Sequence, residues 1–428
     1  MKKILSLFLC CLMVLTLTGC GGSNGDDITT YTYSSELDIK NLDSSDADDG
    51  CSLKAIHAVI DGLTKTDKKG NIVNGVAKSD ELSEDGLTHT YKLRKDVKWT
   101  NGDPVTAHDF VYAWQRIFRK KGSYYYMFAD GIASIEGAQE LSDKIDAGEE
   151  LTDDDLNSMG VKAIDDYTLE VKTTVRVSFF DELMAFPCFF PINEKFCEKQ
   201  GDKYGKSAKA ILGNGAFIMT NWEPGSIAEF KKNEDYYEAK TVKIEKLVMK
   251  LVQDPKVAAQ SFMAGETDYA PITSDLVDKY KDDESFKQVP EGFLYYLSVN
   301  FQNEDLANAN IRQAVSLSIN RKDLCEKVIK DGSSAATGFI PKGVATSPDG
   351  KDFREESGTY ITYSQSKAQQ ALDRGLKELG KSEIKLRITY GTDESPMDVI
   401  ATYLQNSLSK LKGIKVEMVA TTKQDRIY

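Results

Sequence analysis

Few residues of this chain stand in a pattern that is typical of a catalytic site. Its three histidines, His57, His89 and His108, fall on separate predicted elements. A zinc site needs several ligands that converge on one point, so we expect no metal site and no cofactor. The sequence also lacks H-E-x-x-H, G-x-S-x-G, G-x-x-x-x-G-K-[ST] and G-x-G-x-x-G. We therefore expect no catalytic residue, and a protein that is not an enzyme.

The clearest covalent chemistry lies near the N-terminus. Two lysines precede the apolar run Ile4–Leu17, which is too short to span a bilayer, and the run ends in Leu17-Thr18-Gly19-Cys20. This order looks like a bacterial lipobox, so residues 1–19 are predicted to be a lipoprotein signal peptide and Cys20 the lipidation site. Each buried methylene of an acyl chain contributes about 0.8 kcal/mol to membrane binding. Residues 20–27 would be a flexible tether; an ordinary signal peptide is the alternative.

Four cysteines follow the tether, and none of them forms a C-x-x-C motif. Cys188 and Cys197 either form a disulfide outside the cell, or all four thiols, including Cys51 and Cys325, stay free. The sequence leaves this choice open.

Length and charge limit the class of protein. With 428 residues and 41% hydrophobic residues, the chain exceeds one ordinary core, so two or three domains are expected. Its net charge is −13. This charge argues against nucleic acid as a partner and against a basic face on anionic lipid, and it fits a solvated extracellular surface.

The stretch Thr88–Phe118 specifies a strand, a turn and a helix together. Tyr91 and Leu93 alternate with polar residues, which predicts a half-buried strand, and Asn101–Pro104 has turn chemistry. Thr106 stands at a helix N-cap position, with Asp109 three residues on as a variant capping box. The helix that follows carries one apolar stripe, made by Phe110, Val111, Trp114 and Ile117.

That order of residues closely resembles the signature of the extracellular solute-binding proteins of family 5, the oligopeptide-binding lipoproteins of Opp/Dpp-type ABC importers. In the family the signature is a folding element of the second lobe. Other runs resemble the family as well: Leu42-Asp43, Gly160–Lys172, Asn233–Tyr237, Phe262–Asp268 and Ile311–Arg321. Ser44 and Asn320 stand where Pro and Asp are usual.

The resemblance implies an α/β fold of the type II (cluster C) periplasmic-binding-protein class, with two main lobes around a cleft and an extra domain. Residues 28–50 and 190–285 are expected to form the first lobe, 51–189 the second, extra lobe, and 286–428 an incomplete third lobe. A full member of the family returns through on the order of a hundred more residues. In the family, this additional C-terminal segment carries an Asp that binds the α-amino group of the peptide. Whether the stop at Tyr428 is natural or marks a fragment stays open.

The resemblance also implies positions that bind peptide. In the family the loop after Leu-Asp lines the cleft, and this role falls on Asp49, Gly50, Cys51 and Ser52; a plain acidic surface loop is the alternative.

Aromatic and polar residues on two other segments complete the expected site. Tyr124 and Tyr125 resemble a cleft-lining segment and could stack on ligand side chains, or they pack in the core. A strand is predicted over Leu294–Phe301, and the face that we expect toward the cleft carries Tyr296, Ser298 and Asn300.

Local patterns predict several further elements. We expect a helix over Ser52–Leu63, hairpins over 161–173 and 217–231, and a helix from a Ser364 cap to Gly380. The strands Ile384–Tyr390 and Ile414–Ala420, joined by a helix that starts at Ser395-Pro396, form a βαβ unit and should be parallel.

The function that the resemblance implies is delivery of oligopeptides to an ABC permease and its ATPase subunits. The protein would be a lipid-anchored monomer on the outer face of the cell membrane, which is the periplasmic side if a second membrane is present. Within the family, the alternative is that the protein binds a ligand other than an oligopeptide: a dipeptide, a nickel chelate, haem or a pheromone. Two further alternatives lie outside this function: the protein is a truncated remnant that transports nothing, or it is a membrane-anchored hydrolase.

Overall fold

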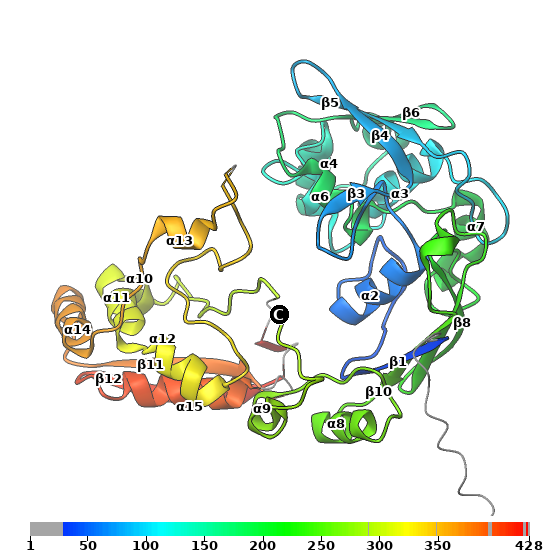
Figure 1. Cartoon of the computed structure of the whole chain (residues 1–428). Helices are drawn as coiled ribbons and strands as arrows, with labels where there is room; N and C mark the ends of the chain where they lie inside the picture. Colours follow the sequence, from blue (N-terminus) through cyan, green and yellow to red (C-terminus); the bar gives the residue numbers. More distant parts are fainter. Residues whose placement is uncertain (1–28, 290, 348, 393–395, 423–424, 427–428) are drawn as a thin grey trace, which may run out of the picture. The chain divides into compact units, whose positions relative to one another are not determined.

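The computed structural model describes residues 29–289, 291–347, 349–392, 396–422 and 425–426. The chain divides into two compact units, one ending at Pro271 and the other beginning at Ile272 (Figure 1). The predicted leader, Cys20 and Ser395 lie outside the described residues. Among the helices that the structure describes, none combines the length and the apolar character that crossing a membrane requires.

The first unit contains two four-stranded sheets. One has the order β1-β10-β9-β8, with β1 parallel to β10 and the other neighbours antiparallel. The other has the order β4-β5-β7-β6 and is antiparallel throughout. A separate pair joins β2 and β3. The strands are β1 (Thr30–Ser35), β2 (Thr64–Thr66), β3 (Ile72–Asn74), β4 (Ala77–Leu82), β5 (Thr88–Leu93), β6 (Val161–Asp165), β7 (Thr168–Lys172), β8 (Phe217–Glu223), β9 (Ile227–Lys232) and β10 (Lys246–Leu251).

Short helices connect these strands, and the two predicted hairpins are confirmed as β6–β7 and β8–β9. The α-helices are α2 (Gly50–Val59), α3 (Ala107–Arg119), α4 (Ala138–Asp146), α5 (Asp153–Asn157), α6 (Phe180–Leu183), α7 (Glu194–Gln200) and α8 (Pro255–Met263). The 3-10 turns are η1 (Tyr125–Phe128), η2 (Pro187–Phe189), η3 (Gly201–Lys203) and η4 (Ala239–Thr241).

The predicted strand, turn and capped helix are confirmed as β5 and α3. Asp109 closes the capping box, because its Oδ2 accepts a hydrogen bond of 2.7 Å from the Thr106 backbone N–H. The apolar stripe of α3 lies in the larger core, where Phe110, Trp114 and Ile117 are fully buried. Three edge-to-face ring pairs involve this stripe and its neighbour Phe118, including Trp114 on Phe128 at 5.6 Å.

Two hydrophobic cores form within the first unit, one around α3 and one between α2 and the β1-β10-β9-β8 sheet. A polar network joins them. The buried carboxylate of Asp61 accepts hydrogen bonds of 2.7 Å from both Tyr236 and Tyr237. The Asp61 backbone N–H donates to Asn214 Oδ1 at 2.9 Å, and the Asn214 amide donates back to the Asp61 carbonyl at 3.2 Å. Each buried polar group of this joint therefore has a partner.

The second unit is built around the predicted βαβ motif. Strands β11 (Ile384–Gly391) and β12 (Ile414–Thr421) are parallel, as expected, and α15 (Met397–Leu408) connects them. Helices α11 (Ala309–Ser318) and α14 (Gln365–Leu379) pack together in its core, and α14 starts at the Ser364 cap and ends at Gly380. The remaining helices are α9 (Ser274–Tyr280), α10 (Glu304–Ala307), α12 (Arg321–Asp323), η5 (Leu324–Ile329) and α13 (Phe353–Ser357).

Two sequence predictions need correction. The helix expected over Ser52–Leu63 spans Gly50–Val59 instead, because Asp49 caps it two residues earlier than expected. The strand expected over Leu294–Phe301 is wrong. Alternation alone does not make a strand, which also needs a neighbour to accept and donate its backbone hydrogen bonds. Within the described part of the chain this segment has no ladder partner.

The capping box makes the stability of the first unit depend on pH. Asp109 is buried, and burial raises its pKa to about 6 from the ordinary 3.8 in spite of its hydrogen bonds to Thr106 and Trp99. A carboxyl whose pKa is raised in the folded state contributes stability below the unfolded pKa, and this contribution is lost as the pH rises through the folded pKa. A shift of two pKa units corresponds to about 3 kcal/mol.

We therefore expect Asp109→Asn to gain stability relative to the wild type, by up to about 3 kcal/mol, as the pH rises from about 4 to 7. The amide keeps an acceptor for the Thr106 N–H and does not ionise. Urea unfolding of both proteins across this pH range measures the difference between their free energies of unfolding. The contributions of all other carboxyl groups are the same in both proteins and cancel in this difference. A difference that stays constant with pH would contradict the assignment.

Candidate functional site

A buried ion pair ties the acidic loop after β1 to helix α3. Arg116 donates to both carboxylate oxygens of Asp43, at 2.7 and 2.8 Å, and Lys120 donates to one of them at 3.1 Å. The Asp43 side chain is only 2% exposed. Burial alone would raise its pKa, but the hydrogen bonds and charges of Arg116 and Lys120 outweigh this effect and hold the pKa below its usual value. Arg116 and Lys120 of α3 thus hold the start of the loop in place.

The end of the loop forms the first turn of α2. Asp49 Oδ1 accepts from the backbone N–H groups of Cys51 and Ser52, at 3.1 and 2.9 Å. Ser52 Oγ donates to Asp49 Oδ2 at 2.6 Å and accepts from the Lys40 and Asn41 N–H groups, and Ser52 is fully buried. The polar atoms of Asp49 and Ser52 are therefore engaged within the chain, and these residues shape the loop.

The other two predicted loop residues differ in exposure. Gly50 is exposed, and a Cβ added there would meet no atom within 4 Å. Cys51 is half-buried, with its Sγ 3.1 Å from the Leu37 carbonyl oxygen, and burial raises its pKa. The four cysteines that the structure describes, Cys51, Cys188, Cys197 and Cys325, are free thiols, so Cys188 and Cys197 do not form a disulfide in it.

The tyrosine segment lies directly against this loop. A Cβ on Gly122 would come within 1.9 Å of the Ser45 carbonyl oxygen, so only glycine permits this approach. Two residues later, the Tyr124 hydroxyl donates to the Asp48 carbonyl at 3.4 Å, and the Tyr124 ring packs edge-to-face on Phe186 with centroids 5.2 Å apart. The structure therefore brings Tyr124 and the Asp49 loop together.

Its two tyrosine neighbours have different surroundings. The Tyr125 hydroxyl donates to Asp146 Oδ1 at 2.6 Å, and its ring lies 6.0 Å from that of Phe118, so Tyr125 is held by α4 and the core. Tyr126 is 50% exposed, and its ring centroid is 6.2 Å from that of Tyr124. Tyr126 is the third residue of the same run of tyrosines, and it is the most exposed of the three.

The three remaining predicted residues belong to the second unit. Tyr296, Ser298 and Asn300 are exposed, and Tyr296 retains 74% of its surface. The Asn300 side chain accepts from the Gln302 N–H at 2.9 Å and begins a turn. Their contribution to a binding site stays a prediction.

Comparison with known proteins assigns the family. Residues 71–427 match the model of the bacterial extracellular solute-binding proteins, family 5. The chain is 32% identical to the dipeptide-binding protein DppE of Bacillus subtilis, over 86% of this chain and 65% of that protein. It is 31% identical to the oligopeptide-binding protein OppA of Bacillus subtilis, over 98% of this chain and 77% of that protein. The chain thus spans just under two thirds of the first relative.

A solved structure gives the same result. Listeria monocytogenes OppA bound to peptide superposes with a TM-score of 0.79 at 30% identity, covering 93% of this chain and 78% of that one. The chain belongs to family 5 of the bacterial extracellular solute-binding proteins. The expected α/β, type II periplasmic-binding-protein fold class is confirmed. The family is one of solute-binding proteins rather than enzymes.

The ion pair at Asp43 leads to a stability prediction. We expect Arg116→Met to lower the free energy of unfolding by about 3 kcal/mol or more at neutral pH, because it leaves a buried carboxylate with a single, partly exposed cation. The loss should shrink at acid pH. The Asp43 pKa is lowered in the folded state, so its contribution is present above the unfolded pKa and disappears as the pH falls through the folded one.

Arg119→Met on the same helix is the matched control. The Arg119 pair with Asp153 is largely exposed, so its loss should cost less than about 1 kcal/mol. Urea unfolding monitored by Trp fluorescence compares the two variants. Equal effects of both would contradict the role given to Arg116.

Proposed function

We propose that this protein binds peptides outside the cell and delivers them to an ABC permease driven by ATPase subunits. The contact between the Tyr124 hydroxyl and the Asp48 carbonyl carries the proposal, because it joins the two segments of the first unit to which sequence analysis assigned peptide binding. The family membership and the similarity to an OppA bound to peptide support it. The protein would act as a monomer, without nucleic acid and without catalysis.

The residues of the loop suggest how a peptide is recognised. The side chains of Asp49 and Ser52 form hydrogen bonds within the chain, and the exposed Gly50 between them has only backbone groups to offer a ligand. An extended peptide that pairs with backbone groups has its own N–H and C=O groups satisfied. Each such bond contributes only about 1 kcal/mol net, whereas an unmade buried one costs about 1–3 kcal/mol. Backbone pairing therefore favours peptides without selecting a sequence.

The aromatic side chains would contact the side chains of the ligand. Tyr124 is fixed by Asp48 and Phe186, and the exposed ring of Tyr126 lies beside it. We propose these two residues as the stacking surface of the site. Tyr125, Tyr296, Ser298 and Asn300 remain further candidates for contact with the peptide.

Calorimetric titration of the full-length protein with a pool of short peptides tests the assignment. Peptide binding, with the peptides recovered intact, is the expected result. Binding of a nickel chelate or haem but of no peptide would overturn it, and so would cleavage of the peptides. A pheromone or dipeptide preference would appear as selection within the pool.

A substitution tests the stacking surface. We expect Tyr126→Ala to weaken peptide binding by about two- to tenfold, because an aromatic contact contributes about 0.5–1.5 kcal/mol beyond its buried area. Tyr167→Ala, at the turn between β6 and β7, removes the same side chain away from the loop and should leave the affinity unchanged. If both variants bind as the wild type does, Tyr126 is not part of the site.

The lipid anchor can be tested separately from binding. We propose that Cys20 carries the diacylglyceryl group, and we expect Cys20→Ser to release the protein from the membrane fraction. Cys11→Ser, inside the apolar run of the leader, should leave the protein in the membrane fraction. Fractionation of cells followed by immunoblotting measures the distribution. Retention of the Cys20 variant at the membrane counts against the lipobox.

A further inference from the structure

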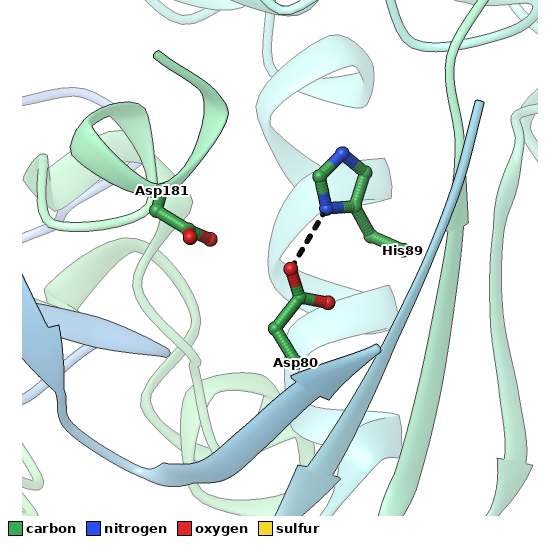
Figure 2. A group of neighbouring side chains, drawn as sticks. All are labelled: Asp80, His89 and Asp181. Atoms are coloured by element: carbon green, nitrogen blue, oxygen red, sulfur yellow. Dashed lines mark hydrogen bonds and ion pairs between the residues drawn. The ribbon is translucent and has the colours of Figure 1, made fainter. Parts of the chain in front are cut away.

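Three potential metal ligands meet on one face of the β4-β5-β7-β6 sheet, in a group that is separate from the proposed peptide site. Asp80 on β4 stands opposite Tyr91 on β5, and His89 lies two residues before Tyr91, so the three side chains share a face. Helix α6 brings Asp181 over the same face. Figure 2 shows the two carboxylates and the imidazole directed toward a common space. The sequence placed the histidines on separate elements and did not reveal this group.

The distances suit a cation. His89 Nδ1 and Asp80 Oδ2 are 3.1 Å apart, and one ligand atom from each residue lies within 4.8 Å of the others. Zinc binds His nitrogen at about 2.0–2.1 Å and carboxylate oxygen at about 2.0–2.2 Å, so neighbouring ligands of a tetrahedral site are about 3.4 Å apart. His89 and Asp80 already have nearly this spacing, and a small side-chain movement of Asp181 would bring the third ligand to the same distance.

The surroundings hold the ligands in place. His89 is 5% exposed, and its ring stacks on Phe180 with centroids 4.3 Å apart. The Tyr91 hydroxyl donates to Asp181 Oδ1 at 2.9 Å, which leaves Oδ2 of that carboxylate for a metal. A second-shell hydrogen bond of this kind orients a ligand and is typical of metal sites.

His89 is the ion-pair partner of Asp80, at 3.1 Å, and it balances charge only when it is protonated. Among the described residues, no lysine or arginine forms an ion pair with Asp80 or Asp181. Asp80 Oδ1 is buried and has no hydrogen-bond partner in the part of the chain that the structure describes. A buried charged oxygen without a partner is costly. A bound cation would satisfy this oxygen and neutralise both carboxylates.

We propose that Asp80, His89 and Asp181 form a binding site for a divalent transition-metal cation of the zinc class, with water completing the coordination. One imidazole nitrogen and two carboxylate oxygens suit zinc and its first-row neighbours better than calcium or magnesium, which prefer oxygen alone. The Asp80 side chain is 19% exposed, so solvent and the ion can reach the site. The ion would fasten α6, and with it the segment that leads to Phe186, onto the sheet.

Calorimetric titration of the untagged full-length protein with zinc chloride at neutral pH tests the proposal. We expect one equivalent to bind and the melting temperature to rise with zinc concentration, because the ion binds the folded state. Asp80→Asn, Asp181→Asn and His89→Gln should each weaken binding about tenfold or more. Asp80 is partly exposed and the change is isosteric, so this variant decides the question if the buried His89→Gln variant does not fold.

The matched control is His108→Gln. His108 and Asp166 form an exposed pair at 3.6 Å, and no third ligand joins them among the described residues. This variant should bind zinc as the wild type does. Cobalt as a spectroscopic probe separates the remaining outcomes: a tetrahedral absorption band that disappears in Asp80→Asn supports the site. A thiolate-to-cobalt band would assign the ion to cysteine and overturn the proposal. The absence of zinc binding would also overturn it, and so would zinc binding that all three substitutions leave unchanged.

Discussion

The carboxylate of Asp43 must be neutralised where it is buried, and Arg116 and Lys120 of helix α3 do this. The same carboxylate accepts from the Ser45 N–H at 3.1 Å, and the Asp43 carbonyl accepts from Asp46 and Ala47, so one residue sets both the anchor and the first turn of the acidic loop. The course of the loop then decides where α2 begins and where Tyr124 can reach Asp48. The position of the candidate peptide site follows from this ion pair.

Local physical chemistry made much of the fold predictable. The capping box at Thr106, the apolar stripe of α3, the hairpin β6–β7 and the parallel pair β11–β12 each follow from residues close in sequence. The resemblance to family 5 then supplied the fold class, because matching runs are spread over most of the chain. These predictions needed no knowledge of which distant residues meet.

The remaining features depend on such distant contacts. The alternation of Leu294–Phe301 predicted a strand, but this segment is not part of any sheet among the described residues, and its own pattern does not reveal that. The sequence placed Asp49 and Ser52 in the predicted peptide-binding loop, but it did not indicate that their side chains bond within the chain. The carboxylates of Asp80 and Asp181 come together only through the register of β4 on β5 and the placement of α6. Unlike Asp43, they have no arginine partner among the residues that the structure describes.

The hydrogen-bond network at Asp61 has a consequence for how the first unit unfolds. Tyr236 and Tyr237 both donate to the single buried carboxylate of Asp61, and Asn214 accepts from the Asp61 backbone N–H at the same point. Separating the cores would leave these groups buried without partners or would expose both cores to water. We therefore expect the two cores to unfold in one cooperative transition.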